Sequence, residues 1–74
     1  MVTEQYLNAA EQDDSKTQNQ LGYLFENGIG VTQDMGKAVR WYQKAANHGF
    51  EPAMDNLTRL KELLGEEAVW SMMV

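Results

Sequence analysis

Apolar positions recur every three or four residues along most of this chain, which is the spacing of amphipathic helices rather than of strands. The first clear helix is expected at residues 16–27. Its apolar face carries Thr17, Leu21, Leu24 and Phe25. Ser15 is expected to cap the start of this helix in a capping box with Gln18, and Gly28 is expected to end it in a left-handed conformation.

Two further helices are expected after loops that contain glycine. Asp34 is suited to the N-cap of a helix that runs to about Asn47, and Pro52 is suited to the first turn of the next helix. The second helix is expected to carry Ala38, Trp41, Tyr42, Ala45 and Ala46 on or near its buried face. The third is expected to bury Ala53, Leu57, Leu60 and Leu64. In the first loop, Ile29 and Val31 are expected to pack into the core.

The chain is similar to itself at an offset of 36 residues. The matched pairs include Tyr6 with Tyr42, Ala9 with Ala45, Leu21 with Leu57 and Leu24 with Leu60. A fixed period of this length indicates stacked helix pairs, none of which can bury its apolar face alone. We therefore expect one all-α domain, a short solenoid of antiparallel helix-pair repeats. Its expected parts are a half repeat at 1–14, a full repeat at 15–50, a half repeat at 51–65 and a C-terminal capping segment at 66–74.

The central unit contains the run LGYLFENGIGVTQDMGKAVRWYQKAANHGF, which resembles a Sel1-like repeat. The positions that match the family pattern are Leu21, Gly22, Phe25, Gly28, Gly30, Val31, Asp34, Ala38, Trp41, Tyr42, Ala45, Ala46 and Gly49. The flanking halves match less well: Thr17, Thr58 and Asp13 stand where the family has alanine or glycine. The resemblance implies a right-handed solenoid related to tetratricopeptide repeats, used as an adaptor in protein complexes.

Composition narrows the choice of partner and compartment. The 74 residues carry a net charge of −5, spread along the chain, so we expect a surface that repels phosphate backbones and no nucleic-acid partner. No apolar stretch is long enough to cross a membrane, and the chain shows no signal peptide. We expect no membrane partner and, if the chain is complete, a cytoplasmic location.

No combination of residues predicts a catalytic, metal or cofactor site. There is no cysteine, and His48 is the single histidine, which is expected to lie beside the carbonyl groups at a helix end. The glycines at 28 and 30 lack the lysine and serine that follow them in a phosphate-binding loop. We therefore expect a non-enzymatic protein with no cofactor and no metal.

The candidate binding surface lies on the polar faces of the first and third expected helices. Its residues are Asn19, Tyr23 and Glu26 on one helix, and Asp55, Arg59 and Glu62 on the other. The 36-residue offset is expected to stack them in rows along a concave groove that receives a protein or peptide partner. The alternative is an ordinary solvated helix face, and the residues leave both interpretations open.

The C-terminal segment is unusually apolar and includes Trp70, Met72 and Met73. It is expected to fold back over the last helix as a cap, because repeat ends are costly to leave bare. The alternative is a contact with another protein or a homodimer through this segment, with Trp70 as a contact residue. Two functional hypotheses remain: an adaptor or regulatory binding module that presents a helical-repeat groove, or a self-associating unit or piece of a longer solenoid scaffold.

Overall fold

The computed structural model describes residue 8 and residues 14–73, and all regular structure in that part of the chain is helical. The helices are α2 (Ser15–Asn27), α3 (Met35–Asn47), α4 (Glu51–Leu64) and α5 (Glu66–Met73). The prediction of an all-α fold is confirmed. Most of the half repeat predicted at 1–14, with Tyr6, Ala9 and Asp13, lies outside the described residues, as does Val74.

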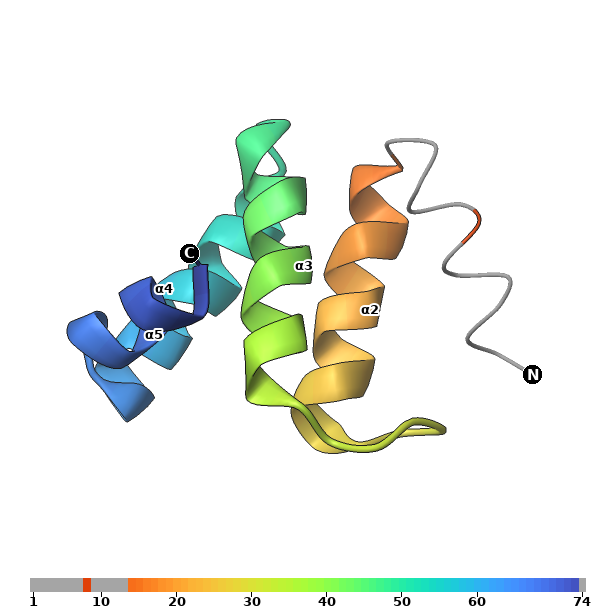
Figure 1. The fold of residues 1–74 in the computed structure, drawn as a ribbon. Helices are drawn as coiled ribbons and strands as arrows, with labels where there is room; N and C mark the ends of the chain where they lie inside the picture. The colour runs from red at the N-terminus through yellow and green to blue at the C-terminus, as the bar shows by residue number, and fades with distance from the viewer. Residues whose placement is uncertain (1–7, 9–13, 74) are drawn as a thin grey trace.

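The helix α3 lies at the centre of the fold. Figure 1 shows α2 beside it and antiparallel to it, with α4 and α5 on its other side. The helix α3 contacts each of the other three, and α4 and α5 also contact each other. The helix α3 therefore packs between α2 on one side and the pair α4 and α5 on the other, as expected for stacked helices of a repeat.

The start of α2 differs from the sequence prediction. Asp14, not Ser15, is the N-cap: its carboxylate accepts a hydrogen bond from the Thr17 backbone N–H at 3.2 Å and another from the Thr17 hydroxyl at 2.9 Å. A carboxylate is as good a cap as a hydroxyl, and the additional hydroxyl bond favours the earlier residue. The predicted end is confirmed, because Gly28 has φ 66° and its N–H donates to the Leu24 carbonyl oxygen.

The loop between α2 and α3 is held mainly by hydrogen bonds. The Asp34 N–H donates to the Phe25 carbonyl oxygen at 2.9 Å, and the Asp34 carboxylate caps α3 as predicted by accepting the Lys37 N–H at 3.1 Å. Val31 packs against the core as predicted. The prediction for Ile29 was wrong, because its side chain is 47% exposed.

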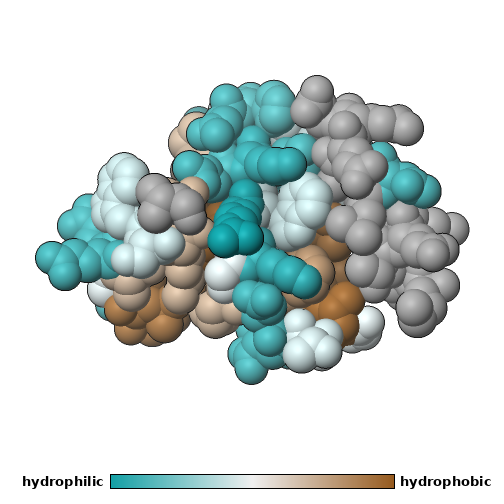
Figure 2. Space-filling model, viewed as in Figure 1, coloured by the Kyte–Doolittle hydropathy of each residue, from teal (hydrophilic) through white to brown (hydrophobic). Residues whose placement is uncertain are grey.

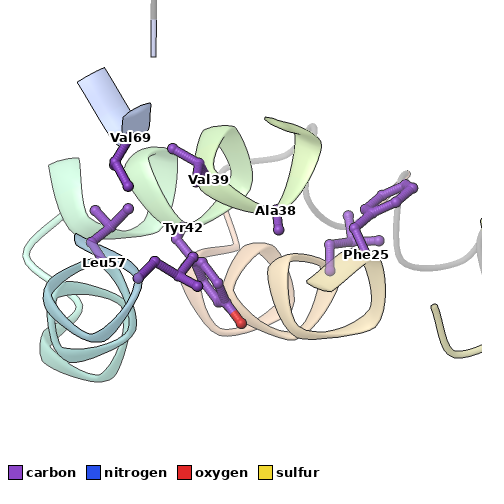
Figure 3. Packing of buried hydrophobic residues seen from close by; sticks show 8 residues of the cluster. Phe25, Ala38, Val39, Tyr42, Leu57 and Val69 are labelled. Carbon is purple, nitrogen blue, oxygen red and sulfur yellow. The ribbon is translucent and has the colours of Figure 1, made fainter. Parts of the chain in front are cut away.

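The core is one cluster of apolar side chains that α3 shares with α2, α4 and α5. Figure 3 shows how these side chains pack in a row. Its fully buried members include Leu21, Val39, Tyr42, Leu60 and Val69. The helices α2 and α3 approach closely at Gly22, where a Cβ atom would lie 2.5 Å from Cδ1 of Tyr42. Leu64 was expected in this core but is 39% exposed, because it is the last residue of α4 and lies beyond the packed turns.

The C-terminal segment folds back as a helix against α3 and α4. Val69 is fully buried, and Met72 and Met73 pack partly buried against the core. The Arg40 Nε donates to the Met72 carbonyl oxygen at 3.2 Å, which ties the end of α5 to α3. Trp70, which was expected to help cover α4, is instead 56% exposed, because Val69 occupies the buried position of this short helix.

Candidate functional site

A hydrogen-bonded network joins α2, α3 and α4 on the side of the molecule where the groove was predicted. At its centre, the Glu26 carboxylate accepts the Tyr42 hydroxyl at 2.8 Å and both terminal nitrogens of Arg59, at 2.7 and 2.6 Å. Such a bidentate arginine–carboxylate pair fixes the relative orientation of the two side chains as well as the distance between them. The Glu26 side chain is only 11% exposed, whereas that of Arg59 is 42% exposed. One carboxylate therefore holds three helices together.

The network sets the charges of its members. The hydrogen bonds from the Arg59 guanidinium hold the pKa of Glu26 below its ordinary value. Burial opposes this shift, and the hydrogen bond from the Tyr42 hydroxyl adds a smaller lowering effect. Burial, and then the neighbouring carboxylate, raise the pKa of Tyr42 well above its ordinary value. The same carboxylate raises the pKa of Arg59. At neutral pH the site therefore contains a charged pair and a neutral phenol.

Two side-chain amides continue the network along the groove. The Arg59 guanidinium also donates to Oδ1 of Asn56 at 3.4 Å, and Nδ2 of Asn56 donates to Oδ1 of Asn19 at 2.9 Å. Beside these amides is an open pocket of about 280 Å³. Its walls are formed by Asn19, Gln20, Tyr23, Leu24 and Asn56. We call this feature the α2–α4 groove.

The predicted site residues fall into four groups. Asn19 and Tyr23 line the α2–α4 groove, and the Tyr23 side chain is 53% exposed. Asp55 and Glu62 are exposed but do not line it. Trp70 lies on α5, with the Lys61 ammonium 5.8 Å from its ring centre.

Glu26 and Arg59 make up the fourth group and correct the predicted arrangement. Glu26 was placed on the polar face opposite the buried residues, but Tyr42 and Arg59 cover it. The direct hydrogen bonds between the two helices join residues 33 and 37 apart, Glu26 with Arg59 and Asn19 with Asn56, and not the repeat equivalents 36 apart. Packed helices cross at an angle, so a side chain meets the neighbouring turn of the next helix instead of its repeat equivalent.

Sequence reasoning missed Asn56, Gln20 and Leu24 as groove residues. Asn56 is the repeat equivalent of Gln20 at the 36-residue offset. A polar residue at both positions was the feature of the sequence that could have indicated the groove. Leu24 was placed on the buried face, whereas it is half-buried and contributes an apolar wall to the pocket.

The residues that line the groove offer hydrogen bonds and apolar contact. Carboxamides can donate and accept at once, which matches a peptide backbone, and the phenol adds an apolar ring with a polar end.

Within residues 14–73, no three histidine or acidic side chains gather as a metal ion would require. The Nδ1 atom of His48 lies 2.9 Å from the Lys44 carbonyl oxygen, at the helix end where it was expected. None of the described helices combines the length and apolar character needed to span a membrane.

The family model and the similar proteins agree on one family. The Sel1 repeat family model matches residues 15–50. The chain is 46% identical over 61 residues to the chitin synthase regulator SKT5 of Malassezia restricta, covering 78% of this chain and 4% of that protein. It is 43% identical over 60 residues to the DAP3-binding cell death enhancer 1 of Rattus norvegicus, covering 81% and 11%. It is also 39% identical over 46 residues to the activator of C kinase protein 1 of Saccharomyces cerevisiae, covering 62% and 7%.

These relatives are far longer than the chain, which spans between 4% and 11% of their length. No solved structure was found to match it. Sel1 repeats generally mediate protein–protein interactions, and the names of these relatives describe a regulator, a binding protein and an activator.

Proposed function

This chain belongs to the Sel1-repeat family, and we propose that it is a non-enzymatic adaptor or regulatory module that binds a protein partner in the α2–α4 groove. The observation that carries the proposal is an exposed tyrosine beside a row of side-chain amides. Tyr23 is 53% exposed although it borders a pocket with Asn19 and Asn56. Tyrosine is among the residues that most often dominate binding energy at protein interfaces.

The network beneath the groove supports the same proposal. The Glu26–Arg59 pair and the bond between Asn19 and Asn56 hold α2 and α4 at a fixed spacing before any partner arrives. A surface that is already ordered loses less conformational entropy when it binds. The groove is small, so we propose that its ligand is a short peptide segment or one turn of a helix.

A second candidate function, self-association or docking of a further repeat, is favoured by a different surface. The corner between α4 and α5 exposes Leu63 at 69% and Trp70 at 56%. Figure 2 shows hydrophobic residues gathered over this end of the molecule, where α4 and α5 lie in Figure 1. In a longer solenoid the next helix pair would cover such a surface. The relatives are long enough to contain further repeats.

The two candidates can be separated by one pair of matched variants. Tyr23→Ser and Trp70→Ser each remove an aromatic ring that is about half exposed, one in the groove and one at the corner. The tagged chain and both variants are used to capture proteins from a native lysate, and each captured protein is quantified by mass spectrometry. Circular dichroism checks that helix content is unchanged, and light scattering over a dilution series measures self-association.

The groove proposal expects a partner that is retained by the chain and by Trp70→Ser but lost by Tyr23→Ser. Truncation of a tyrosine that dominates binding costs about 2 kcal/mol or more, which is about thirtyfold in affinity. Retention of every captured protein by Tyr23→Ser would refute the proposal. Loss of a partner, or of a dimer, with Trp70→Ser alone would assign binding to the corner instead.

A further inference from the structure

A second pocket, of about 340 Å³, lies between the end of α2 and the outer face of α3. The described residues that line it are Phe25, Lys37, Arg40, Trp41 and Lys44. It shares no residue with the α2–α4 groove and none with the exposed corner of α4 and α5. We call it the basic–aromatic pocket.

The charge of this pocket is opposite to that of the chain. The whole sequence has six lysine and arginine residues and a net charge of −5, yet three of the six cations line this one pocket. On a helix, residues 37, 40 or 41, and 44 recur on one face, so α3 itself brings them together. An anionic ligand is repelled by the overall negative charge of this protein but attracted by the local positive charge of the pocket.

Within residues 14–73, none of these three cations forms an ion pair with a carboxylate. The Lys37 ammonium lies 5.4 Å from the centre of the Phe25 ring, and the Lys44 ammonium lies 5.0 Å from the centre of the Trp41 ring. Arg40 uses Nε for the Met72 carbonyl oxygen. The carboxylate of Asp34 is close in sequence, but it accepts the backbone N–H of Lys37 as a helix cap.

The floor of the pocket is apolar. Phe25 closes the core at the end of α2 and is 8% exposed, and Figure 3 shows its ring at the opposite end of the core row from Val69. Trp41 is partly buried against the same core. The ammonium groups of the two lysines lie over these rings, so the pocket brings positive charge and aromatic surface together.

We propose that the basic–aromatic pocket binds an acidic peptide segment of a partner protein, with one aromatic side chain of that segment seated against Trp41 and Phe25. The three cations would contact carboxylates on either side of this side chain. An inorganic anion would use the charge of the rim but not the apolar floor. A nucleic acid would meet only three cations on a chain of net charge −5, which is poor compensation for its own phosphates.

The test uses the fluorescence of Trp41. The whole chain carrying Trp70→Phe has Trp41 as its only tryptophan. The probe is a synthetic hexapeptide, Asp-Glu-Asp-Phe-Glu-Asp, titrated at low ionic strength, where exposed charges are screened least. Two control peptides replace either the acids by Asn and Gln or the Phe by Ser. Inorganic phosphate is titrated separately.

The expected result is a saturable change in Trp41 fluorescence with the acidic Phe peptide, weakened by added salt and by each control replacement. Lys37→Glu and Lys44→Glu should each weaken binding about fivefold or more, since charge reversal turns an attraction into a repulsion. Lys16→Glu makes the same change in net charge at an exposed position on α2 outside the pocket, and it should leave the affinity nearly unchanged. Glutamate is well tolerated at position 37, in the first turn of α3, so this variant should fold.

Four outcomes would overturn the proposal. One is no fluorescence change up to millimolar peptide, and another is equal binding of the Asn and Gln peptide. A third is an equal effect of Lys16→Glu and the two pocket variants, which would mean that only net charge matters. The fourth is full competition by phosphate at the same concentration as the peptide, which would reduce the pocket to an anion site.

Discussion

Gly22→Ala tests the closest approach between α2 and α3. The added Cβ would lie 2.5 Å from Cδ1 of Tyr42, 2.6 Å from Cε1 and 2.9 Å from Cγ, all shorter than normal carbon contacts. The ring has little room to retreat, because Tyr42 is fully buried and its hydroxyl is held by Glu26 at 2.8 Å. The helices must therefore separate, or the hydroxyl bond must break.

The size of the effect follows from two opposing terms. Overpacking of a core costs about 1–3 kcal/mol, and replacement of a helical glycine by alanine returns up to about 1 kcal/mol through helix propensity. Three ring atoms clash at once, so the upper part of the first range applies. We expect the free energy of unfolding to fall by about 1–2 kcal/mol, and the melting temperature by about 5–15 °C for a chain of this size.

Urea unfolding followed by circular dichroism at 222 nm measures this loss. Gly36→Ala is the matched control, since Gly36 is also helical and its Cβ would meet only Oδ1 of Asp34, at 3.3 Å. A Tyr42→Leu background removes the ring edge, and there Gly22→Ala should cost at least 1 kcal/mol less, about the size of the overpacking penalty. An equal cost in both backgrounds, or no cost in the native background, would refute the close-approach explanation.

Two further predictions concern the end of the chain and pH. Val69→Ala should lower the free energy of unfolding by about 1–2 kcal/mol, because Val69 is fully buried. Trp70→Ala, at a half-exposed position, should change it by less than about 0.5 kcal/mol. If urea unfolding shows a larger loss for Trp70→Ala than for Val69→Ala, Val69 is not the residue that anchors α5 to the core. The free energy of unfolding should fall below about pH 4.5, because Glu26 binds a proton more readily in the unfolded chain than in the folded chain. It should fall again above about pH 10, because Tyr42 loses its proton more readily in the unfolded chain. Tyr42→Phe should reduce the alkaline loss, and an unchanged alkaline slope would show that other groups cause it.

The sequence predicted the features that depend on neighbouring residues. Gly28 ends α2, Asp34 caps α3, and most of the residues expected on the buried faces are buried, whereas Leu24, Trp41 and Ala46 are only partly buried. These features are local: a cap involves residues three apart, and a helix face follows from a fixed angle per residue. The early cap at Asp14 was missed because Ser15 is an equally good capping residue one position later.

The features that were missed depend on how helices meet. Nothing in the local pattern shows that Glu26 faces Tyr42 and Arg59, since the partners lie 16 and 33 residues away and on different helices. The exposure of Ile29 has the same kind of cause: the loop is closed by backbone bonds that do not need its side chain. Glu26 was therefore assigned to an exposed face that could contact a partner, whereas it is the centre of the network that joins three helices.

The Glu26 network changes how binding at the groove can be tested. Arg59 is 42% exposed and was predicted to contact a partner, but both of its terminal nitrogens already bind Glu26. Charge reversal at Arg59 would place two carboxylates together and leave Glu26 without its cation, so it would disturb the spacing of α2 and α4 as well as any contact. Loss of binding in that variant would fit both a contact role and a structural role. Tyr23 carries no such ambiguity, because its ring is exposed and outside the network, and it is the residue at which recognition and stability can be measured separately.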